Sequence, residues 1–397
     1  MDDTNDYTFK VLCFRKIQIK VVALLIRDPR VDTSGAERTG ARRVGLALRG
    51  QHHWWSGRPL FKELWRFSYV TREWTRVELR GQAPDELASH CAALVDTRYL
   101  FVFGGTGFPF GESSSNRLSV CNLSSGEWKC VTNSDDTDAP IEQYGQALAV
   151  DPNGDSIYVC GGTTGWLYSM SVHRFDLRSH RWHSLYSRGA YFDNDFPEPR
   201  YRHEIVVHEN RLYVIGGGTS YKCYKLSKIP VFDVESRQWL AMETKNDLNV
   251  MANGVDGYPT RRRCHDCVRA DEHTVYVIGG TNNVVIFDDV WRLDLRLMQW
   301  TLVPTRLPRA VYFHSASVSS TGRLSVFGGV VLWLVLLASL LNMWRTEFYG
   351  RECLYRNLRQ EVMQVAAAVV CGLPDLKSVD EILIGLQIPP NIRQTYL

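Results

Sequence analysis

The sequence of 397 residues lacks an excess of charge of either sign and lacks an apolar run long enough to cross a membrane. It contains 46 basic and 43 acidic residues, a net charge of +3, which does not favour nucleic acid or an anionic membrane as a partner. The most apolar stretch, residues 330–344, is shorter than the roughly 20 residues that a membrane-spanning helix needs. We expect this stretch to form a helix that packs against the rest of the chain or against a partner protein.

The sequence also lacks the motifs of common enzyme classes. It has no nucleotide-binding glycine loop, no Gly-x-Ser-x-Gly nucleophile motif and no convincing cluster of metal-ligating residues. Cys264 and Cys267 have a spacing that suits zinc, but no second pair lies at a zinc-ligand distance and the segment alternates like a strand. We therefore expect no catalytic residue, no metal and no cofactor.

The chain has no pattern of paired cysteines that would indicate a disulfide framework. Its ten cysteines are scattered, several of them inside apolar strands, and no secretory signal precedes them. This usage predicts reduced thiols and a cytoplasmic or nuclear location.

What the sequence does contain is a repeat, a short hydrophobic strand closed by two adjacent glycines. The first glycine of each pair stands at position 104, 161, 216, 279 or 328, a period of 49 to 63 residues. Four of the pairs are followed by a tryptophan after polar residues, and a fifth tryptophan precedes the first pair: Trp128, Trp182, Trp239, Trp300 and Trp74. A β-sandwich with coincidental glycine pairs is the alternative, but five copies in the same register favour a repeat fold.

A period near 50 residues with these features resembles the kelch repeat, whose unit is a four-stranded blade of a β-propeller. Such a blade needs a buried apolar strand, a glycine pair where backbones pack too closely for a Cβ, and a large aromatic side chain between blades. The resemblance predicts an all-β fold: a six-bladed kelch β-propeller whose first blade is incomplete, with a small C-terminal α-helical appendage.

The expected domain boundaries follow from where the pattern begins and ends. Residues 1–45 are expected to be irregular or disordered, residues 46–331 to form the propeller, and residues 332–397 to form a helical tail. No glycine pair precedes the strands around Phe61–Phe67, so either Val44–Leu48 supplies the missing strand or the first blade is open. The last glycine pair has no tryptophan strand after it. We therefore expect Leu60–Trp74 to close the ring with the last blade, which would remove an exposed sheet edge.

A column of residues lies about 14 positions before each glycine pair, and we call these the column residues: His90, Gln146, His203, His265 and His314. The start of one antiparallel strand lies beside the end of the next, so the column and the loops after the glycine pairs should converge on one mouth of the central channel. Polar neighbours at that mouth are Tyr144, Arg200, Arg202, Ser220, Arg262, Arg263 and Tyr312. These groups suit a peptide that carries a carboxylate. The alternative for the histidines is a structural role between blades, whereas the arginines are expected to have few structural partners.

Longer segments carry a more specific resemblance over about residues 60–331: 103–113, 144–147, 200–205, 216–220, 262–267 and 312–316. They are similar to kelch proteins that act as substrate receptors of cullin-2 RING ubiquitin ligases. The resemblance implies that the propeller mouth binds the C-terminal degradation signal of a target, often one ending in glycine. Arg202 and Arg263 would then pair with the terminal carboxylate. The last peptide groups would be bound by Tyr144, His203, Ser220, His265, Tyr312 and His314.

The same resemblance implies a tail that binds elongin C, together with elongin B, and cullin-2. An elongin-binding box would begin at Ser339–Leu340, although Trp344 stands where the family has a small residue. The segment Leu373–Leu376 fits the apolar-Pro-x-apolar pattern of a cullin-2 box. The residues expected to bind elongin and cullin are Leu340, Trp344, Leu373, Pro374 and Leu376.

The predicted function is that of a non-catalytic substrate-recognition adaptor of a cullin-2 RING ligase, which promotes ubiquitination and proteasomal degradation of its targets. Two alternatives stay open. One is a kelch scaffold or signalling regulator that binds a phosphatase or cytoskeletal partner without a ligase. The other is an oxidoreductase propeller, which would require a tightly bound metal.

Overall fold

The computed structural model describes residues 21–22, 44–49, 63–68, 74–85, 87–107, 111–132, 136–187, 196–251, 256–318 and 324–330. The chain divides into two compact units, one of Met1–Val11 with Ile17–Gly329 and one of Leu12–Lys16 with Val330–Leu397. Every described residue except Val330 belongs to the first unit. The predicted helical tail 332–397 lies outside the described residues, as does most of the predicted irregular segment 1–45.

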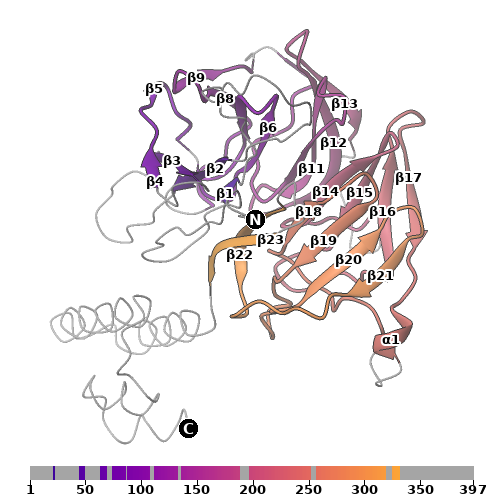
Figure 1. Cartoon of the computed structure of the whole chain (residues 1–397). Helices are drawn as coiled ribbons and strands as arrows, with labels where there is room; N and C mark the ends of the chain where they lie inside the picture. Colours follow the sequence, from indigo (N-terminus) through magenta and orange to yellow (C-terminus); the bar gives the residue numbers. More distant parts are fainter. Residues whose placement is uncertain are drawn as a thin grey trace, which may run out of the picture. The chain divides into compact units, whose positions relative to one another are not determined.

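The described residues form six sheets, four of which have four strands (Figure 1). The first four-stranded sheet consists of β1 (Val21–Val22), β2 (Val44–Arg49), β3 (Glu63–Ser68) and β4 (Trp74–Arg76). The second consists of β10 (Ala147–Val150), β11 (Ser156–Thr163), β12 (Tyr168–Asp176) and β13 (Arg181–Tyr186). The third consists of β14 (Glu204–His208), β15 (Arg211–Ile215), β16 (Lys228–Asp233) and β17 (Gln238–Glu243). The fourth consists of β18 (Asp266–Arg269), β19 (Thr274–Ile278), β20 (Val290–Asp294) and β21 (Gln299–Leu302).

The other two sheets differ in their number of strands. One has five strands: β5 (Arg80–Gly81), β6 (Cys91–Val95), β7 (Tyr99–Phe103), β8 (Leu118–Asn122) and β9 (Glu127–Cys130). The other has only β22 (Tyr312–Val318) and β23 (Leu324–Val330). The helix α1 (Leu248–Met251) is a single turn, and no helix in the described part of the chain is long and apolar enough to cross a membrane.

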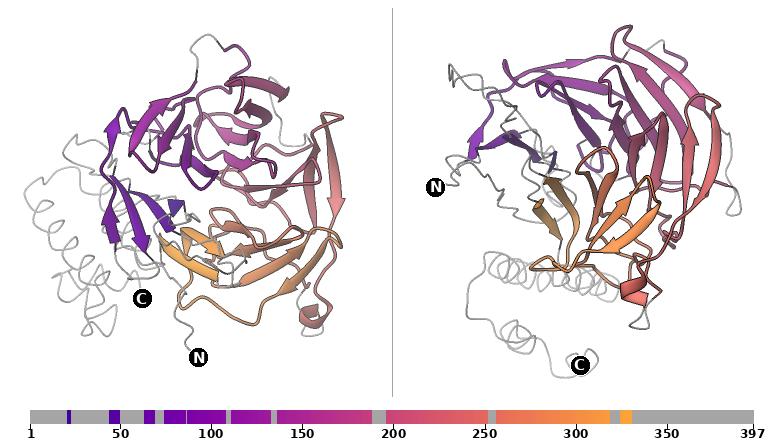
Figure 2. Two further views of the ribbon diagram at one scale, coloured as in Figure 1. Left: turned by 45° about the horizontal axis from the view of Figure 1, so that its top comes forward. Right: turned by 45° about the vertical axis from the view of Figure 1, so that its right-hand side comes forward.

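Neighbouring strands in the four- and five-stranded sheets are antiparallel, except that β5 pairs in parallel with β9. The first strands of neighbouring sheets contact each other in the order β6, β10, β14, β18 and β22, and β1 contacts both β6 and β22. The sheets accordingly follow one another around a common centre (Figure 2). The all-β propeller predicted from the repeat is confirmed.

The ends of the propeller differ from two expectations. The first blade was expected to be incomplete, but it has the four strands β1–β4, and it is the last sheet that has only two strands among the described residues. The strands β3 and β4 do not join β23, because they pair with β2, where Leu48 lies opposite Leu64. The strand at Val44–Arg49 therefore supplies the missing strand of the first blade, the blade that has no glycine pair. A partner so near in sequence requires a shorter loop closure than one at the other end of the propeller.

The glycine pairs have a conformation and a packing that exclude side chains. All ten of these glycines have φ between +53° and +109°, a region that L side chains rarely adopt. A Cβ on Gly161 would lie 2.5 Å from Cε1 of His203 in the next sheet. A Cβ on Gly216 would lie 2.5 Å from Cε1 of His265, again in the next sheet. The first glycine of a pair thus leaves the space that the column residue of the next sheet occupies.

The second glycine of the first four pairs binds the next sheet through its backbone. Its N–H group donates to the carbonyl that lies three positions before the next column residue. This bond recurs in four pairs, from Gly105 to Gln143 (3.0 Å), Gly162 to Arg200 (3.0 Å), Gly217 to Arg262 (2.8 Å) and Gly280 to Val311 (2.8 Å). The close backbone approach inferred from the sequence is therefore an inter-sheet hydrogen bond.

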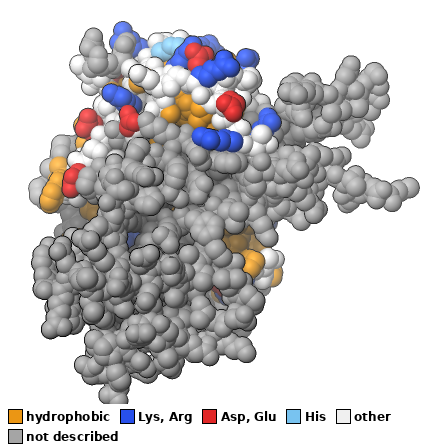
Figure 3. All heavy atoms as spheres, turned by 90° about the vertical axis from the view of Figure 1, so that its left-hand side faces the viewer, with side chains coloured by type: hydrophobic (Ala, Val, Ile, Leu, Met, Phe, Trp, Pro, Cys, Tyr) orange, Lys and Arg blue, Asp and Glu red, His pale blue; other side chains and the backbone are white. Residues whose placement is uncertain are grey.

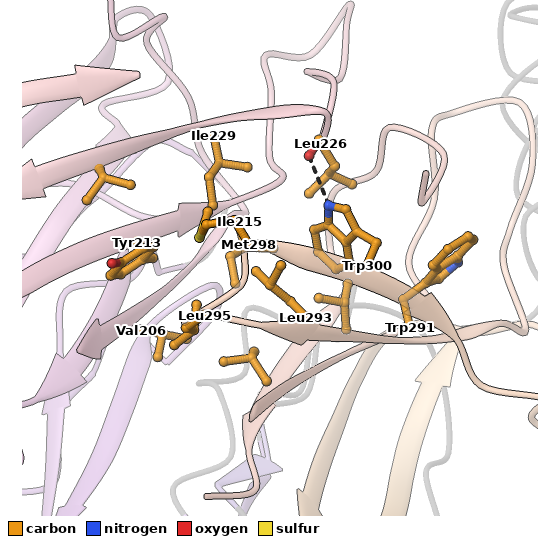
Figure 4. Packing of buried hydrophobic residues seen from close by; sticks show 13 residues of the cluster. Val206, Tyr213, Ile215, Leu226, Ile229, Trp291, Leu293, Leu295, Met298 and Trp300 are labelled. Carbon is orange, nitrogen blue, oxygen red and sulfur yellow. Dashed lines mark hydrogen bonds between the residues drawn. The ribbon is translucent and has the colours of Figure 1, made fainter. Parts of the chain in front are cut away.

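Two of the repeated tryptophans, Trp182 and Trp300, show how these side chains pack between neighbouring sheets. The ring centroid of Trp182 lies 5.3 Å from that of Phe103 in the preceding sheet. Trp300 is fully buried in a cluster that includes residues of both β14–β17 and β18–β21, and its Nε1 donates to the Leu226 carbonyl at 3.2 Å (Figure 4). The core therefore consists of interfaces between sheets, as the propeller resemblance implies.

Replacement of Gly216 by alanine should destabilise the protein by about 3 kcal/mol, since it combines a positive φ with a collision against His265. Gly154 is a matched control, because its φ is also positive (+75°) but its Cβ would meet no atom closer than 3.9 Å. Gly154→Ala should cost only about 1 kcal/mol. Urea unfolding of the two variants measures the difference, and equal losses would contradict the packing explanation.

His314 should make the stability depend on pH. Burial lowers its pKa to about 4, and a backbone hydrogen bond with Ile278 only partly opposes this. The unfolded state, with a pKa near 6.5, binds more protons at intermediate pH, so stability is complete above about pH 6.5 and falls as the pH approaches 4. The contribution lost between about pH 7.5 and pH 5 is about 2 kcal/mol.

Glutamine occupies the equivalent column position at Gln146, so His314→Gln should be tolerated and should remove this part of the pH dependence. Urea unfolding at both pH values would measure it. Some dependence should persist in the variant, because burial also lowers the pKa of His173. An unchanged pH dependence in the variant would show that His314 does not titrate as stated.

Candidate functional site

The residue directly before each column residue has a left-handed backbone. We call these five the channel-facing residues, and their φ values are +53° for Ser89, +66° for Gly145, +56° for Arg202, +55° for Cys264 and +56° for Phe313. Only one of the five is glycine. A left-handed backbone is unfavourable for the other four, so the surrounding structure must hold it in place.

Hydrogen bonds between the channel-facing residues provide that support. The N–H group of each donates to the carbonyl of the one before: Gly145 to Ser89 (2.9 Å), Arg202 to Gly145 (2.7 Å), Cys264 to Arg202 (3.1 Å) and Phe313 to Cys264 (2.9 Å). Five sheets are thereby linked in series around the channel. Together with the column residues and Glu204, the channel-facing residues line a cavity of about 60 Å³, which has room for a few water molecules.

The column residues are buried between the sheets. His90, His203, His265 and His314 are all less than 5% exposed, and Gln146 donates from Nε2 to the Phe103 carbonyl of the preceding sheet at 2.9 Å. The structural interpretation of the column therefore has direct support. Their imidazoles also line the narrow cavity, so His203, His265 and His314 lie close to the predicted arginine Arg202.

The structure separates the four predicted arginines into two kinds. Arg262 is fully buried and makes a bidentate ion pair with Asp289 (2.6 and 2.9 Å), and Arg200 is paired with Glu198 at 2.8 Å. Each also donates to the carbonyl of the first glycine in its own sheet. The expectation that mouth arginines have few structural partners is therefore wrong for these two.

Arg202 and Arg263 both contact one tyrosine, Tyr201. The Arg202 guanidinium carbon lies 4.8 Å from the ring centroid of Tyr201 and 4.5 Å from that of Phe313. Arg263 donates to the Tyr201 hydroxyl at 3.1 Å and to the carbonyl of Thr219 and the side-chain amide oxygen of Asn283. These partners of Arg263 are neutral oxygens, so they orient the guanidinium without cancelling its charge.

The residue two positions before each column residue lies at the mouth. Four of these five pair with the residue that follows a glycine pair: Ala88 with Thr106, Tyr144 with Thr163, Tyr201 with Gly218 and Arg263 with Thr281. The fifth is Tyr312. The column and the post-glycine loops therefore converge, as the sequence predicts.

The mouth tyrosines are neutral hydrogen-bonding groups. Burial raises the pKa of Tyr144, Tyr201 and Tyr312, so their phenols keep the proton at neutral pH. Tyr144 lies beside the loops that contain Gly111 and Gly165. Ser220 is exposed on the next loop, where its N–H donates to the Tyr168 hydroxyl at 3.0 Å.

The two cysteines with zinc-like spacing have different surroundings. Cys264 is buried in the channel wall, where burial raises the pKa of its thiol although Arg202 and Arg263 act in the opposite direction. Cys267 lies on β18 and is half-buried. Across the described ranges, no three His, Cys, Asp or Glu side chains are grouped so that they could hold a metal ion.

Sequence reasoning missed three residues of this site: Tyr201, Cys264 and Phe313. Their positions relative to the column were the available signal, because Tyr201 and Tyr312 occupy the same place in the repeat as Tyr144.

The predicted tail residues lie outside the described residues: Leu340, Trp344, Leu373, Pro374 and Leu376. On the face in Figure 3, the described basic and acidic side chains are intermingled, with no large patch of one sign.

The comparisons with known proteins cover the same part of the chain. The family profile of the KLHDC2/KLHL20/DRC7 Kelch-repeats domain matches residues 50–217 and 111–329. The chain is 40% identical to kelch domain-containing protein 10 of Homo sapiens over 299 residues, which cover 72% of this chain and 64% of the relative. It is 40% identical over 310 residues to the Xenopus tropicalis protein of that name, covering 74% of this chain and 72% of the relative. The Drosophila melanogaster homolog is 38% identical over 289 residues, covering 68% and 46%.

The chain therefore spans about two thirds or less of the length of the human and fly relatives. The matched residues include all the described mouth residues and all five glycine pairs. The repeat is assigned to the kelch type by the 40% identity over 299 residues and by the family profile, which matches the sheets between residues 50 and 329. The chain belongs to the kelch-repeat family, in the group formed by kelch domain-containing protein 10 and its homologs.

Proposed function

We propose that the chain is a substrate-recognition adaptor of a cullin-2 RING ubiquitin ligase and that its propeller mouth binds the C-terminal end of target proteins. The observation that carries the proposal is that Arg202 and Arg263 both contact Tyr201, so their guanidinium groups lie near each other. Two guanidinium groups near neutral phenols and a hydroxyl-rich loop form a set of donors that suits a carboxylate.

The narrowness of the channel supports recognition of a chain end. A cavity of about 60 Å³ cannot admit a folded segment, so a peptide would lie at the mouth with its last residue towards Arg202. A terminal residue without a side chain would fit this space best, which would favour a terminal glycine. His203, His265, His314, Tyr144, Tyr312 and Ser220 would border the last peptide groups.

The ligase half of the proposal is supported by the tail sequence. The pattern Leu373-Pro374-Asp375-Leu376 resembles a cullin-2 box, and Leu340 with Trp344 has the register of an elongin-binding box. The adaptor would present a bound target to the ligase and perform no chemistry itself. We also propose a six-bladed ring as the complete propeller, since six first strands contact one another in series.

Replacement of Arg202 or Arg263 by methionine should weaken the binding of a glycine-ended peptide acid by about tenfold to a hundredfold, because each charge-assisted bond contributes about 1.5 to 3 kcal/mol. The wild-type chain should bind the acid far more tightly than the matching amide, in calorimetric titration. Arg296→Met, the same change on the exposed β20–β21 turn, is the control and should keep wild-type affinity. Equal binding of acid and amide would refute carboxylate recognition.

Substitution of Leu373 and Leu376 by aspartate in the full chain should abolish co-purification with cullin-2, since apolar contacts of a cullin box cannot tolerate charge. Deletion of residues 332–397 should in addition abolish recovery of elongin B and elongin C. Peptide binding at the mouth should be unchanged in the aspartate variant, which serves as its folding control. If the wild-type chain recovers a phosphatase or cytoskeletal partner and no cullin-2, the scaffold alternative holds.

A further inference from the structure

Three neighbouring loops at the mouth carry large apolar side chains at their tips, where they are exposed to solvent. The exposed fractions are 90% for Trp166, 61% for Leu167, 91% for Tyr221, 85% for Val284 and 48% for Val285. We call these five residues the apolar rim. They come from the β11–β12, β15–β16 and β19–β20 connections, each of which follows a glycine pair. Exposed aromatic residues grouped in this way mark interaction surfaces rather than core.

The loops that bear the rim are held in shape by their own threonines. Thr163 Oγ1 donates to the Leu167 carbonyl at 2.8 Å and accepts from the Gly165 N–H at 3.0 Å. Thr281 makes the same two bonds, to the Val285 carbonyl at 2.8 Å and from the Asn283 N–H at 3.1 Å. The rim side chains thus project from fixed turns, and little backbone ordering is needed when a partner binds them.

The loops are also tied to one another and to the mouth. The Ser220 N–H donates to the Tyr168 hydroxyl, which joins the second loop to the first. Asn283 Nδ2 donates to the Ser220 carbonyl at 3.2 Å, which joins the third loop to the second. The same Asn283 side chain accepts from Arg263. The apolar rim and the cationic mouth therefore form one continuous surface.

We infer that the apolar rim binds bulky apolar side chains of the target that lie upstream of the residues entering the mouth. This inference rests on the proposed function, because it assumes a chain end at Arg202 and Arg263. The surface has a fixed order of polarity, cationic at the centre and apolar outside. Its matching partner is an extended C-terminal segment with a carboxylate at its end and large apolar residues before its terminal residues.

The arrangement of a cationic mouth beside separate apolar loop tips favours an extended C-terminal segment over a compactly folded partner. A row of three separate loop tips beside the mouth can contact successive side chains of an extended chain, whereas a flat apolar patch would suit a folded surface. Trp and Tyr are the residues that most often dominate binding energy at interfaces. Burial of these two side chains supplies affinity, and the mouth supplies the position of the chain end.

The test uses the full chain and two short acetylated peptides that end in the same glycine. One has leucines upstream of the terminal residues and the other has serines at those positions. The wild-type chain should bind the leucine peptide about tenfold more tightly or better, and Trp166→Ser with Tyr221→Ser should bring the two affinities within about threefold. Leu297→Ser is the matched control, since Leu297 is 50% exposed on the β20–β21 turn, and it should keep the preference.

The outcomes distinguish the rim from the mouth. If wild-type protein prefers acid over amide but binds leucine and serine peptides equally, the rim inference is overturned and carboxylate recognition stands. A leucine preference that survives in the rim variant also overturns it. If neither peptide binds, carboxylate recognition fails and the rim inference fails with it. Because the substituted side chains are exposed, the thermal unfolding of the variants should match that of the wild type, which excludes misfolding as the cause of lost affinity.

Discussion

Four successive sheets are each held against the next by a side chain that fills the space left by a glycine. His203 at Gly161, His265 at Gly216 and Gln146 at Gly104 repeat this contact along the propeller. The contact requires the glycine to have no Cβ and requires the column residue to stand at the start of its sheet, directly before the first strand in the case of Gln146, His203 and His265. Those two requirements set the spacing between sheets and the place where each chain segment enters the channel wall.

The mouth is a consequence of that packing. Three consecutive residues in each repeat have three different surroundings: the column residue lies between sheets, the residue before it faces the channel, and the one before that pairs with the post-glycine loop. In the third and fourth sheets these short segments place Tyr201, Arg202 and Arg263 together. A rigid scaffold thus positions functional side chains through residues adjacent to those that stabilise it.

The sequence alone predicted the sheets, the glycine pairs and the convergence on one mouth, because each depends on a local pattern that recurs. It did not predict which arginines are structural. Arg262 finds its carboxylate 27 positions later, at Asp289, and such a pairing depends on a fold that a local pattern does not describe. The same holds for the partner of β3, where two candidate strands had equal local merit and only the assembled sheet selects Val44–Arg49. Tyr201 differs from Arg262, because its repeat position is visible in the sequence but its contacts with Arg202 and Arg263 depend on side-chain positions in the assembled propeller.

The channel-facing residues are linked in series by hydrogen bonds between backbone N–H and C=O groups. These bonds do not depend on the side chain that each residue carries. Five successive positions hold serine, glycine, arginine, cysteine and phenylalanine on the same backbone geometry. The identity of these side chains can therefore change by single substitutions while the architecture that displays them persists. Related chains with the same propeller can therefore select different ligands. Each needs only different side chains at these five channel-facing positions.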